Sequence, residues 1–148
     1  MIPRILEEVR NKGHKIFVNG DFNLNIIGIR SASKIANKFD DQIKLVFKSK
    51  GQWVELTFPI TTDPGLYWLD NPSNVNGTAI LCAGQYRGVY QLGLHRNSYK
   101  ALVQRGGKVK VYRDKNKDSK LDMLPESIDS GYFGINIHRS AKKGESTN

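Results

Sequence analysis

The sequence predicts a mainly β fold, a mixed sandwich- or barrel-like sheet preceded by one short helix. Its apolar runs are short, and glycine, asparagine or proline separates one run from the next. Aromatic residues, which suit a half-buried pleated surface, are spread along the chain as six Tyr, six Phe and two Trp. No apolar run approaches the ~18 residues of a transmembrane helix, so no membrane span is expected.

The helix is expected near the N-terminus. Pro3 suits the first turn of a helix, the apolar residues Ile5, Leu6 and Val9 fall on one face, and Gly13 is a stop signal. This segment has neither the long apolar run nor the cleavage site of a signal peptide. The protein is therefore expected to be synthesised in the cytoplasm without a signal peptide, and to need another route if it acts at a cell wall.

Residues 42–60 carry the clearest strand pattern. The runs 42–48 and 53–58 flank Ser49-Lys-Gly-Gln52 and predict a hairpin, which Pro59 is expected to end. Further strands are expected at residues 15–18, 24–29, 79–82, 90–94, 99–103, 108–112 and 132–137.

The length of 148 residues indicates one domain, with an N-terminal helix and hairpin part (1–60) and a second part (61–148). The composition is that of a globular protein, with 39% apolar and 25% charged residues. The single cysteine, Cys82, excludes an internal disulfide and a multi-cysteine zinc site.

The net charge of +9 is concentrated in one stretch of the chain. Residues 96–120 hold nine basic side chains against two acidic ones, a net charge of +7. Such a stretch predicts an anionic partner: nucleic acid, an anionic cell wall or a membrane surface. The alternative is a solvated lysine-rich face that only aids solubility.

The strongest candidate for chemistry is His138, at the end of the apolar run 132–137. A sheet can hold a histidine at its edge while the ring projects into a cleft, where a general base deprotonates a thiol or hydroxyl. The alternative is a structural histidine at a strand end.

Three motifs carry a resemblance to a known family: Thr62-Asp-Pro-Gly65, Gly84-Gln-Tyr-Arg-Gly-Val-Tyr90 and Gly131-Tyr-Phe-Gly-Ile-Asn-Ile-His-Arg139. Together they resemble phage and gut-bacterial cell-wall proteins, and the last is similar to the strand–His segment of L,D-transpeptidase (YkuD-type) domains. The resemblance covers the chain from about residue 61 onward. It implies a sheet of that type, a cysteine nucleophile with a histidine base, and peptidoglycan stem peptides as substrate, as in a phage lysin.

The chain departs from that family in two ways. Arg139 follows His138 where the family usually has glycine, and the expected Ser-x-Gly-Cys block is absent from the ten residues after His138. The sequence therefore predicts either a reading frame truncated before the catalytic cysteine or a protein that has lost the activity, and truncation is favoured. Cys82 lies in a buried-looking strand end and is expected to be an inert core residue.

His95 repeats the pattern of His138, because Leu92-Gly-Leu-His-Arg96 is also an apolar run ending in His-Arg. Two such ends can meet at one cleft edge, where Arg96 or Arg139 binds a stem-peptide carboxylate through its planar fork. The resemblance adds Tyr86 and Arg87 as substrate-binding candidates. The alternative for His95 is a partly exposed histidine with no role.

The segment Asp114-Lys-Asn-Lys-Asp-Ser-Lys-Leu-Asp122 is similar to the first part of an EF-hand calcium loop. Its oxygen-bearing residues at positions 1, 3, 5 and 9 are candidate calcium ligands: Asp114, Asn116, Asp118 and Asp122. Position 6 is Ser119 rather than glycine, position 12 is Pro125, and three lysines are interleaved. A solvated β-turn is the alternative.

Two functions of different classes follow. The first is a cysteine-dependent peptidoglycan enzyme with His138 as its base. The second is a non-catalytic basic β domain that binds an anionic polymer, such as a phage structural protein. Tyr99 and Tyr112 are placed to stack on single-stranded nucleic acid, but the sequence has no recognised nucleic-acid-binding signature, which argues against that partner.

Overall fold

The computed structural model describes residues 1–33, 35–36 and 38–140. The chain forms two compact units, one made of Met1–Ala32 and Asp40–Ile60 and the other of Ser33–Phe39 and Thr61–Asn148. The mainly β prediction is confirmed: three antiparallel sheets follow the short N-terminal helix, and within the described residues none of them closes into a barrel. The boundary between the two units at residue 60 coincides with the boundary between the two parts expected from the sequence. The single-domain organisation stays a prediction.

The first unit begins with helix α1 (Arg4–Asn11), which starts after Pro3 and ends before Gly13. Gly13 has a φ of +82°, a left-handed conformation that glycine adopts without strain and that stops a helix. Leu6 is fully buried on the apolar face of α1, as the spacing of the apolar residues predicts.

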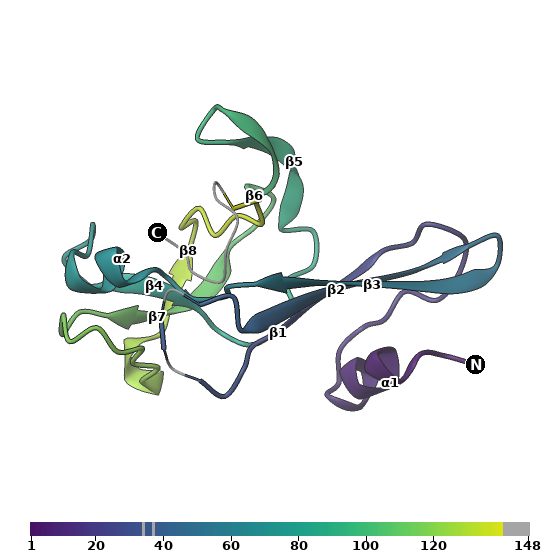
Figure 1. Ribbon diagram of the computed structural model, residues 1–148, viewed down its shortest axis with the longest axis horizontal. Helices are drawn as coiled ribbons and strands as arrows, with labels where there is room; N and C mark the ends of the chain where they lie inside the picture. The colour runs from purple at the N-terminus through teal and green to yellow at the C-terminus, as the bar shows by residue number, and fades with distance from the viewer. Residues whose placement is uncertain (34, 37, 141–148) are drawn as a thin grey trace. The chain divides into compact units, whose positions relative to one another are not determined.

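Three antiparallel strands complete this unit in the order β1 (Asn25–Ile29), β2 (Asp41–Ser49), β3 (Gln52–Ile60) (Figure 1). The predicted β2–β3 hairpin is confirmed, with Ser49 paired to Gln52 across a two-residue turn. Lys50 and Gly51 have φ values of +52° and +75°, as a type I′ turn requires. Pro59 lies inside β3 instead of ending it, and this edge strand tolerates its missing N–H.

The strand expected at residues 15–18 does not form. The backbone of Phe17 bonds instead to the side chain of Asn25, which accepts from the Phe17 N–H at 2.8 Å and donates to its carbonyl at 2.9 Å. A buried asparagine thus provides one residue with both of the bonds that a neighbouring strand would give.

The second unit contains helix α2 (Leu66–Asp70), the 3₁₀ helix η1 (Pro125–Ser127) and a sheet with strand order β4 (Thr78–Leu81), β7 (Val109–Asp114), β8 (Asp129–Gly131). Two apolar clusters form its core. One contains Leu69, Ile80 and Leu121, and the other contains Val89, Val109 and Val111.

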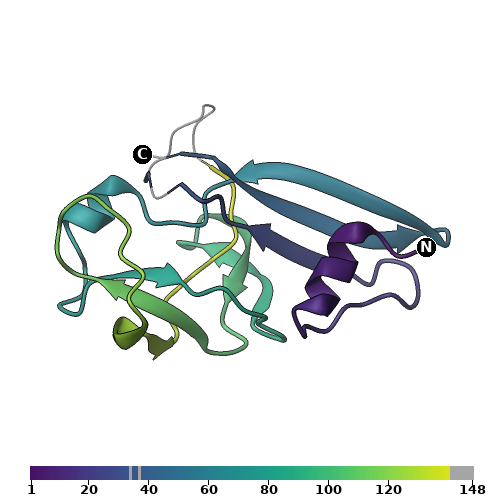
Figure 2. The same ribbon diagram turned by 90° about the horizontal axis from the view of Figure 1, so that it is seen from below.

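A two-stranded sheet of β5 (Tyr90–His95) and β6 (Tyr99–Gln104) belongs to the same unit (Figures 1 and 2). Its corner is formed by Arg96 and Asn97, which both have left-handed φ values. The register pairs His95 with Tyr99, so the candidate histidine lies next to the turn of this hairpin.

The prediction of a strand at residues 132–137 is wrong. β8 ends at Gly131, and residues 132–140 are irregular except at Ile137, which forms an antiparallel bridge with Leu102 of β6. Gly134 has a φ of +66°, which interrupts an extended run. The segment therefore connects two sheets instead of extending one.

Candidate functional site

The structure brings His95 and His138 together. Ile137 exchanges two backbone hydrogen bonds with Leu102, at 2.8 and 3.0 Å, and so places the residue after it beside β6. The two imidazole rings stack with their centroids 3.9 Å apart and their planes 15° from parallel. His138 is exposed and His95 half-buried, so the pair lies at the surface.

The neighbours of His138 assign its tautomer. Its Nδ1 lies 2.9 Å from the carbonyl oxygen of Arg139, which can only accept, and 3.0 Å from the hydroxyl of Tyr99. The Tyr99 hydroxyl itself donates to the same carbonyl at 3.2 Å. We therefore infer that Nδ1 carries the proton in the neutral ring, which leaves the lone pair on Nε2.

The neighbours of His95 assign the opposite tautomer. The side-chain oxygen of Asn136 accepts the Gln104 N–H at 3.0 Å, so its Nδ2 faces the Nδ1 of His95 at 3.2 Å as a donor. Nδ1 of His95 then accepts, and the proton of the neutral ring is on Nε2. Burial, the charge of His138 and the charge of Arg96 lower the pKa of His95, in that order of importance.

Two arginines belong to this site. The guanidinium of Arg139 lies over the Tyr99 ring at 4.7 Å, a cation–π contact that leaves the exposed side chain able to bind an anion. Arg96 is exposed and has a left-handed φ at the hairpin corner. Tyr99, a stacking candidate in the nucleic-acid alternative, contacts His138 and Arg139.

Sequence reasoning missed Gln104, which fixes the segment that carries His138. This buried side chain donates to the carbonyls of Gly107 (3.1 Å) and Gly131 (2.9 Å). It also accepts the backbone N–H groups of Phe133 (3.1 Å) and Ile135 (3.2 Å). A polar residue as the last member of an apolar strand is the only signal in the sequence, and many exposed strand ends share it.

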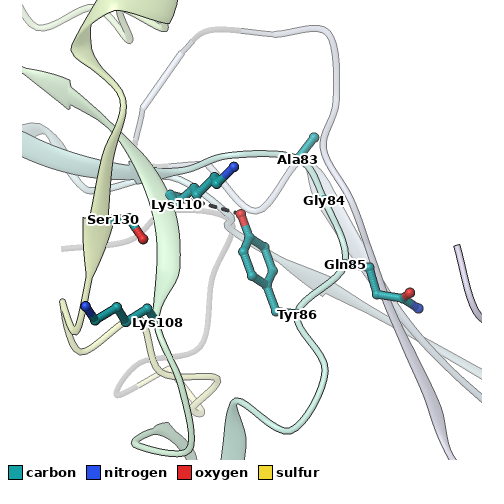
Figure 3. Close-up of a pocket in the computed structure, with 7 residues that line it drawn as sticks. All are labelled: Ala83, Gly84, Gln85, Tyr86, Lys108, Lys110 and Ser130. Carbon is teal, nitrogen blue, oxygen red and sulfur yellow. Dashed lines mark hydrogen bonds between the residues drawn. The ribbon is translucent and has the colours of Figure 1, made fainter.

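Tyr86 lines a hollow of about 380 Å³ with Ala83, Gly84, Gln85, Lys108, Lys110 and Ser130 (Figure 3). Its hydroxyl donates to the carbonyls of Cys82 (2.7 Å) and Lys110 (3.3 Å), which holds the loop after β4 against β7. Neither Arg87 nor either histidine of the stacked pair lines this hollow. Of the two substrate-binding candidates that the resemblance adds, Tyr86 lines this hollow and Arg87 does not.

Cys82 is buried, with 8% of its surface exposed, and its N–H donates to the carbonyl of Lys110 at 2.9 Å. Burial among the strands of an apolar sheet suits the expected inert thiol better than a nucleophile.

The residues expected to bind calcium lie in a tight loop that also contains three lysines. Asp114 is 2% exposed, and its Oδ2 accepts the backbone N–H of Asp122 at 2.8 Å. Burial raises the pKa of Asp114, the backbone N–H groups of Asp122 and Asn116 oppose this rise, and the charges of Asp122 and Asp118 add to it. Within the described residues, no three Asp, Glu, His or Cys side chains already converge as a metal site.

No family model, no curated protein and no solved structure matches the chain. The L,D-transpeptidase resemblance therefore stays a prediction. In the part of the chain that the structure describes, no helix combines the length and apolarity that crossing a membrane requires.

Proposed function

We propose that this chain carries the general base of a cysteine-dependent, L,D-transpeptidase-like enzyme that processes peptidoglycan stem peptides. The observation that supports the proposal most is the hydrogen bonding of His138: the Arg139 carbonyl holds its Nδ1 proton and leaves Nε2 as a base on an exposed ring.

The stacked ring of His95 adds a second function to the site. Its neutral form carries an N–H at Nε2, whereas the neutral ring of His138 has its lone pair on that atom, so in this stacked pair one ring can donate a hydrogen bond and the other can accept a proton. The pKa of His95 is lowered, chiefly by burial, which favours the neutral form of this ring. This difference between the two rings suits a site in which one histidine accepts a proton during catalysis and the other stays neutral.

In the proposed reaction, Nε2 of His138 takes the proton of a cysteine thiol, and the thiolate attacks the carbonyl carbon of a stem-peptide bond. The C–N bond breaks, the imidazolium returns its proton to the leaving amine, and a thioester remains. Water or another amine then releases the acyl group. Arg139 binds a substrate carboxylate.

The scheme requires a cysteine thiol other than that of Cys82, which is buried. The resemblance implies a Ser-x-Gly-Cys segment a short way after the histidine. Translating the reading frame beyond the Asn148 codon tests this directly. A cysteine in such a segment supports the proposal, and a stop codon at that place removes it.

The activity test uses the complete product of that reading frame and a disaccharide-tetrapeptide substrate, with products followed by mass spectrometry. Release of the terminal residue or formation of a new cross-link is expected from the unaltered protein. His138→Gln should lower turnover at least a hundredfold while substrate binding persists. His14→Gln, in the other unit, is the matched control and should turn over normally. Equal activity of the two variants would overturn the role of His138.

The charge distribution favours a second candidate, binding of an anionic polymer without catalysis. Of the nine basic side chains at 96–120, all in the described part of the chain, only Arg113 is held by a carboxylate, Asp129 at 3.0 Å, and the other eight are exposed. Lys108 and Lys110 also line the hollow beside Tyr86 (Figure 3). Binding to purified cell walls that weakens with salt, and weakens further in a Lys108→Gln/Lys110→Gln variant, supports this candidate. Salt-independent binding contradicts it.

A further inference from the structure

The loop between β7 and η1 contains two left-handed residues, with positions counted from Asp114 as position 1. Positions 4 and 6, Lys117 and Ser119, have φ values of +59° and +62°. Left-handed residues at these places turn the chain back on itself, so that the carboxylate at position 1 reaches the backbone at position 9. Glycine usually provides the turn at position 6 of such loops.

A buried oxygen in this loop lacks a partner. Asp114 is 2% exposed, and its Oδ1 accepts no hydrogen bond from any residue in the described part of the chain. The other oxygen of the same carboxylate accepts the N–H of Asp122, so the group points across the loop from position 1 to position 9. A buried carboxylate oxygen without a donor is costly unless a cation takes that place.

The remaining oxygen ligands are near and loosely held. Asn116 donates its side-chain amide to the Asp122 carboxylate, and the Asp118 carboxylate accepts the Lys120 N–H at 3.0 Å. All of these contacts lie at the surface, so rotation of exposed side chains exchanges them for metal ligation. The hydroxyl of Ser119 donates to the carboxylate of Asp70 at 2.6 Å, which places a further acidic group at the rim of the loop.

From this arrangement we infer that residues 114–122 form a calcium site, with the side chains of Asp114, Asn116, Asp118 and Asp122 as ligands. Hard oxygen donors from carboxylates and an amide suit calcium rather than a softer metal. Lys115, Lys117 and Lys120 occupy positions 2, 4 and 7, and all three side chains are exposed. The missing glutamate of position 12 makes the site weak, with a Kd of about 0.1–1 mM, the range of extracellular calcium modules.

Isothermal titration calorimetry and thermal unfolding of the whole chain with calcium chloride test this inference. One site and a rise in Tm on adding 5 mM calcium are expected, with a smaller response to magnesium. Asp114→Asn keeps the acceptor for Asp122 but should weaken binding at least tenfold and abolish the Tm rise. Asp40→Asn, the same change on an exposed residue of the other unit, should bind as the unaltered chain does.

A second variant keeps the test decisive if Asp114→Asn does not fold. Ser119→Gly suits the left-handed φ of position 6 and releases Asp70, and we expect it to tighten calcium binding severalfold. Absence of binding up to 10 mM calcium, or binding that neither variant changes, would overturn the site.

Discussion

Replacing Gln104 by alanine tests whether one buried amide positions the segment carrying His138. The change removes four hydrogen bonds, two donated to Gly107 and Gly131 and two accepted from Phe133 and Ile135. A hydrogen bond contributes about 0.5–1.5 kcal/mol to stability, so the variant should lose about 2–6 kcal/mol. That is a large part of the total of about 5–15 kcal/mol for a domain.

Urea unfolding followed by tryptophan fluorescence measures this loss. Trp53 lies in the first compact unit and Trp68 in the second, so a Trp53→Phe background reports the unit that contains Gln104. Gln91→Ala, on the exposed surface of the paired strand, is the matched control and should change stability by less than about 0.5 kcal/mol. A loss below about 1 kcal/mol in Gln104→Ala, or equal losses in both variants, would contradict this role of the buried amide.

Three other features of the second unit can be tested in the same way. Gly106→Ala should destabilise this unit by about 3 kcal/mol in urea unfolding, because a Cβ would lie 2.1 Å from the Gly88 carbonyl oxygen, while Gly28→Ala, with open space around it, should be neutral. By NMR, His95 should titrate below its ordinary pKa of 6.5, and His138→Ala should raise that pKa by removing a stacked ring and its charge. Since the folded-state pKa of His95 is the lower one, stability from this ring should decline as pH falls below about 6.5, and a flat profile would contradict the burial argument. Tyr99→Phe removes the hydroxyl that contacts His138 Nδ1 and Arg139, and should cost about 1 kcal/mol of unfolding free energy with a change in the His138 NMR signals.

The elements that the sequence predicts well are those that local pattern determines. The β2–β3 hairpin follows from two alternating runs around Lys50-Gly51, and β4 and β7 follow from β-branched residues that a buried sheet requires. The short strand β8 could not be predicted, because Asp-Ser-Gly has no strand propensity and is extended only through its pairing with Val109–Val111.

The two wrong strands have the same physical cause. At residues 15–18 and 132–137 the pattern is apolar, but buried amide side chains, Asn25 and Gln104, bond the backbone groups that a neighbouring strand would otherwise bond. Period-two patterns describe which face of a strand is buried. They say nothing of a distant amide that competes for the same N–H and carbonyl groups.

The candidate site, like the fold, could be predicted from the sequence only in part. The repeated apolar–His–Arg pattern indicated that His95 and His138 are strand-end residues of one kind, and the structure stacks them although 43 positions separate them in the sequence. The residues that position them, Asn136 and Gln104, could not be predicted from the sequence because, apart from Gly107, their partners are 27 to 41 positions away.

The different neighbours of the two stacked rings give the rings different tautomers. The carbonyl oxygen of Arg139 accepts from Nδ1 of His138, whereas the side-chain amide of Asn136 donates to Nδ1 of His95. Protonation of His95 would place an N–H at Nδ1 against the N–H of Asn136, so this donor opposes protonation of His95. The burial that lowers the pKa of His95 acts in the same direction. Asn136→Asp would replace the donor by an acceptor and should raise the pKa of His95, and an unchanged His95 titration in this variant would show that the amide does not oppose protonation of this ring.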